Sequence, residues 1–369
     1  MVQKITRIMD VAKAAGVSTA TVSRALSNPD LLTEATRETV FAAIRSTGYR
    51  VNRTARNLRT RQAGAVLVLV PNLGNPFFSQ ILAGISETLG ERELSVLIAD
   101  TSDPAISDKP LVDYFLDSQI DGMISLDGGL DECELQRFDD NGFSGRFVFA
   151  CEWVHGSGLP SVRSDNGRGA RLAVRHLHAM GHRKIAHLTG PENNVLTHAR
   201  REGMIEERAR LGLPARDEWI IRGDFSLQSG QMAAQKILAM DERPSAVFCA
   251  SDQVAFGLMS TLSAGGLRVP EDISVIGFDD IELSEFYVPP LTTIRQNRRA
   301  LGSKAAALLL ERIDPETAMA QSRDASAGGS SVGRAPPEET PLDQSQAGHS
   351  PVVVDVELVN RSSVAAPSA

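Results

Sequence analysis

Short apolar runs of strand length alternate with helical patterns along most of this chain, and this alternation limits the possible folds more than any other feature. Residues 65–70, AVLVLV, are apolar throughout and end at a Pro-Asn turn signal, as in a strand buried on both faces. More than nine strands are expected over about 300 residues, which favours two doubly wound lobes of parallel sheet with helices on both faces. The clearest of these strands are expected at 65–70, 95–99, 122–126, 147–151, 184–188, 246–250 and 273–277, and helices are expected near 78–89, 167–180, 198–211, 228–240 and 253–265.

Length and composition set the outer limits. The chain has 369 residues, which suits two or three domains, and 42% of them are apolar, enough for packed cores. The three cysteines are odd in number, far apart and without CxxC spacing, so they indicate a reducing cytoplasm rather than disulfides or a zinc site. The sequence has no run of 18 apolar residues and no apolar segment behind Met1, so we expect neither a membrane span nor a signal peptide.

The net charge of −8 hides an asymmetry between the two ends of the chain. Residues 1–62 carry 11 lysines and arginines against 4 aspartates and glutamates, whereas the rest carries 27 against 42. A basic head on an acidic body predicts a nucleic-acid-binding module joined to a second function. A basic, solvated tail is the alternative.

The head has helical patterning, which a solvated tail would lack. Apolar residues recur at i, i+3, i+4 and i+7 within residues 8–15, and Gly16 can end this first helix. Ser18 is placed to cap a second helix, and Thr33 is placed to cap a third helix that Gly48 stops. Two short helices about a tight glycine turn, supported by a third, indicate a helix-turn-helix. A small helical bundle without a role in DNA binding is the alternative.

The second helix carries short side chains, which let a backbone approach a DNA groove, beside one long cation. The short side chains are Thr19, Ala20, Thr21 and Ser23. Arg24 is long enough to reach guanine O6 and N7 with two parallel hydrogen bonds. The charge and the pattern together predict that this helix reads DNA bases.

Residues 50–62 contain five arginines and few apolar side chains, so this segment cannot bury a face by itself. Leu58 is the one large apolar side chain within residues 53–61. An apolar wedge flanked by arginines is how minor-groove binders unstack a base step. The alternative is a flexible linker.

Polar side chains follow several of the expected strands at the point where each strand ends. In doubly wound sheets, ligands lie beyond these carboxyl ends. Carboxylates can bind pairs of hydroxyls and aromatic rings can cover apolar sugar faces, so these side chains suit a polyhydroxylated ligand. Taken singly, each is a common cap or turn residue. The oxygen-bearing residues are Asn72, Asn75, Asp127, Glu152, Ser251, Asp252, Asp279 and Asp280, and the accompanying cation and rings are Arg200, Phe77, Phe78 and Phe225.

No catalytic constellation stands out, so we expect neither an enzyme nor a cofactor. The sequence contains no GxSxG, no HExxH and no Gly-rich phosphate loop. Four histidines between residues 176 and 187 resemble a metal cluster, but His176 and His178 project about 200° apart on a helix. His187 lies on an expected strand, so no metal site is expected there.

Many of these segments are similar to the lactose/galactose-repressor (LacI/GalR) family of transcription regulators. The clearest match is residues 10–26, DVAKAAGVSTATVSRAL. The matches run in order over almost the whole chain, residues 320–351 excepted. The further matches are Thr36-Arg37, Gly48-Tyr49, 55–60 (ARNLRT), 71–78 (PNLGNPFF), 181–185 (GHRKI), Gly190-Pro191, 251–257 (SDQVAFG), 273–280 (ISVIGFDD) and 289–294 (PPLTTI).

The resemblance implies a homodimeric repressor, located in the cytoplasm and on the nucleoid, that reads a palindromic operator in double-stranded DNA and binds a small-molecule effector. Its α/β fold would comprise an all-α helix-turn-helix head at 1–49, a hinge at 50–62 and a two-lobed core of periplasmic-binding-protein type at 63–365. The N-lobe would span about 63–161 plus 293–319, and the C-lobe about 162–292 plus 352–365. Between them lies a mobile loop at 320–351, where 19 of 32 residues are Ala, Ser, Gly or Pro, before a last strand at 352–359.

The resemblance also assigns roles to single residues. A sugar or sugar derivative is the expected effector, with a nucleobase or another metabolite as the alternative. Base edges would be contacted by Thr19, Ala20 and Arg24, the DNA backbone by Ser18, Thr21, Tyr49 and Asn52, and the minor groove by Leu58 and Arg59. The effector cleft would include Phe77, Glu152, Arg200, Phe225, Ser251 and Asp279.

Four positions depart from the family pattern. Arg7 stands where a capping Thr is usual, with Thr6 before it, so the cap of the first helix is expected to shift or to be lost. Glu152 stands where Asp is commoner, Leu196 replaces a polar cleft residue, and Arg298 stands where some members have an apolar one. These changes bear on the identity of the ligand. A sugar-binding protein without a DNA role and a sugar-processing enzyme on the same scaffold are the rival functions.

Overall fold

The computed structural model describes residues 6–49, 62–107, 109–313 and 350–367. The chain divides into two compact units, residues 1–63 and 64–369, and each has an apolar core of its own. None of the helices among the described residues is long and apolar enough to cross a membrane.

The first unit is built from three helices about a small apolar core. These are α1 (Ile8–Ala15), α2 (Thr19–Ser27) and α3 (Glu34–Thr47), with a 3₁₀ turn, η1 (Pro29–Leu31), between the last two. Gly16 ends α1 in the left-handed region, at φ +66°, and the chain turns directly into α2. Val11, Val22 and Val40, one from each helix, are fully buried in the core. The predicted helix-turn-helix is confirmed.

Helix α1 begins after Arg7 without a hydroxyl cap. The Arg7 backbone N–H donates instead to the Asp10 carboxylate at 2.8 Å, so an acid in the first turn satisfies this helix end. The Thr6 hydroxyl makes a different contact and donates to the Thr47 carbonyl oxygen at 3.0 Å. Thr6 therefore ties the start of α1 to the end of α3.

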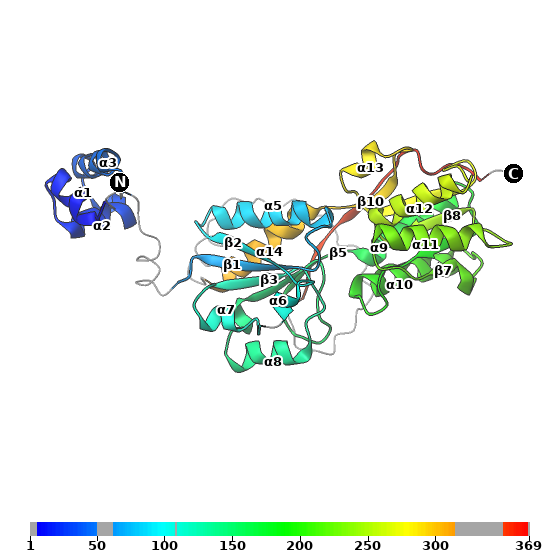
Figure 1. The fold of residues 1–369 in the computed structure, drawn as a ribbon, viewed down its shortest axis with the longest axis horizontal. Helices are drawn as coiled ribbons and strands as arrows, with labels where there is room; N and C mark the ends of the chain where they lie inside the picture. The colour runs from blue at the N-terminus through cyan, green and yellow to red at the C-terminus, as the bar shows by residue number, and fades with distance from the viewer. Residues whose placement is uncertain (1–5, 50–61, 108, 314–349, 368–369) are drawn as a thin grey trace, which may run out of the picture. The chain divides into compact units, whose positions relative to one another are not determined.

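The second unit contains two six-stranded sheets, one in each lobe (Figure 1). The N-lobe sheet has the order β11-β5-β4-β3-β1-β2, and all its paired strands are parallel. All six residues of its inner strand β1 are buried, as their unbroken apolar run predicts. The strands are β1 (Ala65–Val70), β2 (Ser95–Asp100), β3 (Gly122–Ser125), β4 (Phe147–Ala150), β5 (Ser161–Ser164) and β11 (Val352–Val354), and the helices are α5 (Phe77–Gly90), α6 (Pro104–Ser107), α7 (Asp113–Leu116), α8 (Glu132–Asp140) and α14 (Arg298–Ile313), with a 3₁₀ turn η2 (Ser144–Arg146).

The C-lobe sheet has the order β12-β10-β9-β8-β6-β7. Its strands pair in parallel except for β12, which runs antiparallel to β10 at one edge. The strands are β6 (Ile185–Leu188), β7 (Ile220–Ile221), β8 (Ala246–Cys249), β9 (Ser274–Asp279), β10 (Thr292–Gln296) and β12 (Val356–Val359), and the helices are α9 (Asn166–Ala179), α10 (Val195–Arg210), α11 (Leu227–Leu238), α12 (Asp252–Ala264) and α13 (Leu283–Phe286), with a 3₁₀ turn η3 (Asp217–Trp219).

Within the described residues the chain crosses between the lobes three times, each time through a single residue. Asp165 joins β5 to α9, Asn297 joins β10 to α14, and Asp355 joins β11 to β12. Two of the crossings are tied together, because the Asp165 backbone N–H donates to the Val354 carbonyl oxygen at 3.1 Å. Short crossings of this kind allow two lobes to rotate about them while keeping the lobes close.

The expected lobe boundaries are wrong by a few residues at each crossing. They place 162–164 and 352–354 in the C-lobe and 293–296 in the N-lobe, but β5 and β11 belong to the N-lobe sheet and β10 belongs to the C-lobe sheet. The expected single strand at 352–359 is also wrong, because it breaks at Asp355 and its halves join different sheets. An apolar run predicts a buried strand, but only its partner strands decide which sheet it joins.

Candidate functional site

Helix α2 presents one uncovered face, formed by side chains from its first two turns. Thr19, Ala20 and Arg24 are exposed, whereas Val22 and Ala25 are buried. At 100° per residue, the three exposed positions span about 140° of the helix circumference. The structure therefore leaves open the three side chains that are expected to meet base edges.

The residues expected at the DNA backbone also have structural contacts of their own. Ser18 caps α2, because its Oγ accepts the Thr21 backbone N–H at 3.1 Å and lies 2.9 Å from the Thr21 hydroxyl. Tyr49 is half-buried against the core of the first unit. The remaining three expected DNA contacts lie outside the described residues: Asn52, Leu58 and Arg59.

The second candidate site is a small cavity between the two lobes of the core. It is partly open to solvent and offers about 40 Å³ to water, which is room for about three water molecules. The side chains come from separate segments that each follow a strand, as expected for a ligand site in such sheets. All six residues expected in the effector cleft line it: Phe77, Glu152, Arg200, Phe225, Ser251 and Asp279.

Arg200, from α10, is the buried cation of this cavity, with a side chain 2% exposed. Its Nε donates to Asn166 Oδ1 at 2.9 Å, and its Nη1 donates to the Ala250 carbonyl oxygen. The guanidinium carbon lies 3.8 Å from the centre of the Phe278 ring. The Nη2 atom is 3.9 Å from Asp279 Oδ1, beyond hydrogen-bond distance, so this corner of the guanidinium keeps capacity for a ligand.

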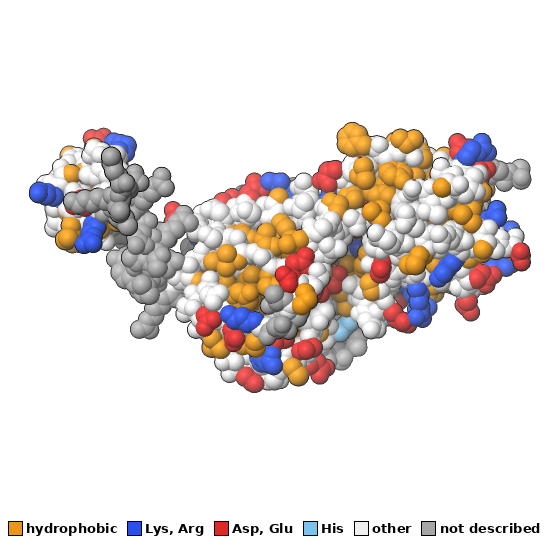
Figure 2. Space-filling model, in the orientation of Figure 1, with side chains coloured by type: hydrophobic (Ala, Val, Ile, Leu, Met, Phe, Trp, Pro, Cys, Tyr) orange, Lys and Arg blue, Asp and Glu red, His pale blue; other side chains and the backbone are white. Residues whose placement is uncertain are grey.

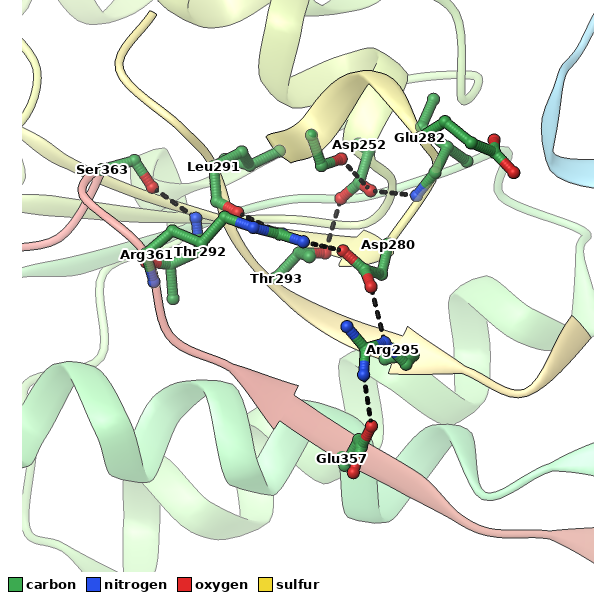
Figure 3. A network of polar contacts seen from close by, with 12 residues as sticks. Asp252, Asp280, Glu282, Leu291, Thr292, Thr293, Arg295, Glu357, Arg361 and Ser363 are labelled. Atoms are coloured by element: carbon green, nitrogen blue, oxygen red, sulfur yellow. Dashed lines mark hydrogen bonds and ion pairs between the residues drawn. The ribbon is translucent and has the colours of Figure 1, made fainter. Parts of the chain in front are cut away.

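Two buried carboxylates lie beside Arg200, and they differ in what they already bind. Burial raises the pKa of Asp279 to about 6, and this carboxylate accepts Gln296 Nε2 at 2.7 Å. Burial, with the nearby Asp279 charge, raises the pKa of Asp252 to about 7. Asp252 accepts the hydroxyls of Ser284 and Thr293 at 2.6 Å each, one on each of its oxygens (Figure 3). Asp252 therefore connects α12 to α13 and β10 within the C-lobe, whereas Asp279 is the carboxylate that lines the cavity.

Glu152 lines the cavity from the N-lobe. Its carboxylate accepts the Gly128 backbone N–H at 3.1 Å and interacts with the side chain of Asn194, which caps α10 in the C-lobe. Burial raises the pKa of Glu152, since the charged form loses water on entering the protein. The contact between Glu152 and Asn194 therefore joins the two lobes beside the cavity.

Three non-glycine residues of the cavity lining have positive φ angles. The angles are +70° at Cys151, +67° at Phe225 and +117° at Asp279. Such conformations cost on the order of 1–3 kcal/mol each and persist only where the surroundings impose them. Their concentration around one small cavity is typical of a ligand site.

Sequence reasoning missed part of the cavity lining. Cys151 was not expected there, although its place directly before Glu152 at the end of β4 is a usable signal. Asn75 and Phe78 also line the cavity, but the sequence placed them only in its neighbourhood, and Leu196 completes the set. Asp127, expected at the same strand ends, does not line the cavity and instead accepts the Thr101 hydroxyl.

Comparison with known proteins decides the family. Residues 7–52 match the model for bacterial regulatory proteins of the lacI family, and residues 174–331 match a periplasmic binding protein-like domain. The chain is 41% identical over 308 residues to the HTH-type transcriptional repressor CytR of Escherichia coli strain K12, which covers 82% of this chain and 89% of CytR. The chain belongs to the lacI family. It is also 33% identical over 307 residues to the repressor PurR of Photobacterium profundum, covering 83% and 91% of the two chains.

Solved structures agree with this lacI-family assignment. The lac repressor dimer bound to operator and the anti-inducer ONPF has a TM-score of 0.76 at 30% identity, covering 98% of this chain and all of that one. The CelR–cellobiose complex has a TM-score of 0.68 at 28% identity, covering 97% and 99%. This lacI-family protein is a DNA-binding transcriptional repressor and not an enzyme, which sets aside both rival functions.

Proposed function

We propose that this repressor changes its affinity for operator DNA when a small polyhydroxylated metabolite binds in the interlobe cavity. The observation that carries the proposal is the set of polar groups that converge on the cavity from both lobes. The C-lobe supplies Arg200 Nη2 and the Asp279 carboxylate, and the N-lobe supplies Glu152. A carboxylate can accept a hydrogen bond from one hydroxyl of a ligand while the guanidinium beside it donates a hydrogen bond to a neighbouring hydroxyl.

The small size of the cavity would couple ligand binding to rotation of the two lobes. Room for about three water molecules is too little to bury a sugar, so burial of a sugar requires the lobes to rotate about the crossings at Asp165, Asn297 and Asp355. A ligand then shifts the balance between two lobe arrangements by its differential affinity for them. Either release or recruitment of the repressor is compatible with this scheme.

The lining of this cavity favours a sugar or sugar derivative over a nucleobase. Phe77 and Phe78 pack edge to face, with ring planes 76° apart, so these two rings do not offer the parallel faces that sandwich a flat base. Two solved relatives carry sugars: CelR with cellobiose, and a regulator from Enterococcus faecium with bound ribose, which has a TM-score of 0.65 at 27% identity and covers 82% of this chain and 99% of that one.

A thermal-shift screen of the full chain tests this assignment. We expect at least one monosaccharide, D-ribose among those screened, to raise the melting temperature by mass action. The same sugar should change the mobility of an operator fragment in a gel shift. Stabilisation by a nucleobase and by no sugar would contradict the sugar assignment while keeping the cavity as the effector site.

At the DNA, we propose that Thr19, Ala20 and Arg24 contact base edges from the uncovered face of α2. Ser18, Thr21 and Tyr49, with Asn52 of the hinge, would contact or support the DNA backbone. Leu58 and Arg59 would enter the minor groove at the centre of the operator.

Leu58→Ala tests the proposed wedge. This change should weaken operator binding and reduce the DNA bend, because unstacking a base step needs an apolar side chain between the bases. Circular-permutation gel shifts measure the bend. An unaltered bend with Leu58→Ala would defeat the wedge, and binding of the stabilising sugar should be unchanged in either case.

We propose further that two copies of the chain form the DNA-binding dimer, as the solved lac repressor dimer on operator suggests. Apolar side chains gather over α12 and α13 of the C-lobe (Figure 2). Leu283, Phe286 and Val288 there are 50%, 75% and 88% exposed, and Leu97 and Ile98 on the edge strand β2 are 41% and 47% exposed. Large exposed apolar groups of this kind mark interfaces. Sedimentation of Phe286→Asp as a monomer would support the assignment, and an unchanged dimer would contradict it.

A further inference from the structure

Arg298 is a buried cation in the first turn of α14, and it has partners in both lobes. Its side chain is 8% exposed. On the N-lobe side, Nη1 lies 3.4 Å from the Pro76 carbonyl oxygen and 3.5 Å from that of Phe77. On the C-lobe side, Nη2 donates to the Asp280 carbonyl oxygen at 3.1 Å and to Glu282 Oε1 at 3.4 Å. One guanidinium thus spans the gap between the lobes.

The N-lobe end of this contact is rigid. Helices α14 and α5 pack so closely that a Cβ added at Gly302 would lie 2.0 Å from the Ile81 carbonyl oxygen. A Cβ added at Gly84 would lie 2.3 Å from the Arg299 carbonyl oxygen. Because α14 packs tightly on α5, we expect Arg298 to move with the N-lobe, so its contacts to the C-lobe are the ones that lobe rotation must break.

The C-lobe end is rigid as well. The Asp280 carboxylate is paired with Arg295 at 2.6 Å and with Arg361 at 2.7 Å, and Arg295 is paired in turn with Glu357 of β12 (Figure 3). These pairs fix the loop after β9 to the edge of the C-lobe sheet. The Asp280 carbonyl oxygen, which accepts the hydrogen bond from Arg298, is therefore expected to move together with the whole C-lobe.

The partners of Arg298 are also joined to the cavity. Phe77 lines the cavity, and its carbonyl oxygen is a partner of Arg298. Asp279 also lines the cavity, and the next residue, Asp280, accepts the hydrogen bond from Arg298. On the other side, Arg298 faces an open groove of about 770 Å³ that is lined by both lobes. Enlarging the cavity pulls these partners apart, and the groove leaves space for that movement.

We propose that Arg298 is a positioning residue that latches the two lobes in the arrangement of the structure and so sets the affinity of the cavity for its ligand. The latch itself stands on the contacts described above. Its effect on ligand affinity rests on the proposed function, since it needs a ligand in the cavity.

The test compares Arg298→Met with Arg299→Met in the full chain. Arg299 is its neighbour on α14 and pairs with Glu87 of α5 at 2.8 Å, so its partner lies within the N-lobe and it serves as a matched control. Spin labels on exposed Cys133 of α8 and on a cysteine introduced at exposed Lys236 of α11 report the distance between the lobes. An excess of unlabelled Cys133→Ser chain keeps one labelled copy in each dimer.

Without ligand, we expect one narrow distance for the parent chain and for Arg299→Met, and a broadened or shifted distribution for Arg298→Met. Arg298→Lys, which can reach one lobe at a time, should give an intermediate width and serves if the methionine variant does not fold. An unchanged narrow distribution in the folded Arg298 variant overturns the latch, whether or not any ligand is found.

Ligand affinity gives a second readout that a merely structural role would not produce. If the latch opposes the liganded arrangement, Arg298→Met should bind D-ribose, or whichever sugar stabilises the parent chain, about 10-fold more tightly. A merely damaged cavity would bind the sugar more weakly, and that result would overturn the coupling. If no sugar binds the parent chain, the proposed function fails, and the spin-label distances still decide the latch.

Discussion

The two candidate sites of this repressor are built in opposite ways. In the first unit, the expected base-contacting residues lie within six positions of one another on α2, and all three are exposed. In the core, the residues of the cavity come from segments between Asn75 and Asp279, and most are buried. The base-contacting residues share a single helix face, whereas the cavity exists only once two sheets and three crossings are in place.

This difference determines whether a substitution at each site changes function, stability or both. Substitutions on the open face of α2 remove contacts to DNA and leave the fold alone, because the core of the first unit lies on the opposite face. Substitutions in the cavity disturb buried charges that balance one another, such as Arg200 and Asp279. Effects on function and on stability should therefore separate in the first unit and mix in the core.

The largest expected effect is the loss of the effector response in Asp279→Asn. Replacing the carboxylate by an amide removes hydrogen bonds to ligand hydroxyls that are strengthened by charge, which should weaken effector binding by about 100-fold. Binding of operator DNA without effector should persist, because the first unit has a core of its own. Titration calorimetry and a gel shift measure the two properties.

Asp272→Asn is the matched control, because Asp272 pairs with Arg268 on the surface of the C-lobe. It should leave both properties unchanged. If Asp279→Asn keeps normal effector binding, the cavity is not the effector site.

The next effect is a dependence of stability on pH that comes from the core alone. Burial raises the pKa of Asp279 to about 6 and that of Asp252 to about 7, against about 3.9 in an unfolded chain. Between about pH 4 and pH 7 these two carboxyls hold more protons in the folded core than in the unfolded chain, so their contribution to the free energy of unfolding falls as the pH rises. The fall is on the order of 2–3 kcal/mol for Asp279. Buried His187 contributes with the opposite sign, because burial lowers its pKa to about 4.

Melting curves followed by near-ultraviolet circular dichroism between pH 4.5 and 8 measure this slope. The difference between the parent chain and Asp279→Asn isolates the Asp279 contribution, because the amide does not titrate. A stability advantage of the parent chain over Asp279→Asn that grows with pH across the window would contradict the assigned sign.

Arg24→Ala should have a smaller effect, confined to DNA. Losing a bidentate contact to guanine should cost roughly 1–3 kcal/mol of operator binding and relax the choice of base at one position in each half-site. Lys13→Ala, which removes an exposed cation from α1 of the same unit, should weaken binding to all sequences alike. Unchanged operator preference in Arg24→Ala, measured on a set of single-base operator variants, would count against base reading.

The sequence predicted more of the helix-turn-helix than of the cavity, because a sequence pattern is local. Helix periodicity and caps such as Ser18 are local, so the three helices of the first unit could be placed from neighbouring residues. Glu152, Ser251 and Asp279 could be grouped because each follows an expected strand, and the resemblance to the family completed the set of six. Pairing between distant strands, however, is invisible in a local pattern. That limit explains why β5, β10 and β11 were assigned to the wrong lobes. It also explains why Arg298 was interpreted only as a departure from the family pattern that bears on the ligand, and not as a contact between lobes.

The smallest expected effect tests whether the first unit has a weak point of its own. Thr6→Val keeps the side-chain shape but loses the hydrogen bond to the Thr47 carbonyl oxygen, which should cost about 1 kcal/mol. Because the two units have separate apolar cores, this loss should speed amide hydrogen exchange in α1 and α3 without changing exchange in the second unit. Asp10→Asn should act in the same direction, since it weakens the carboxylate cap at the Arg7 backbone N–H. Faster exchange in the core as well would mean that the two units unfold together, and the contrast between them would then be one of function and not of stability.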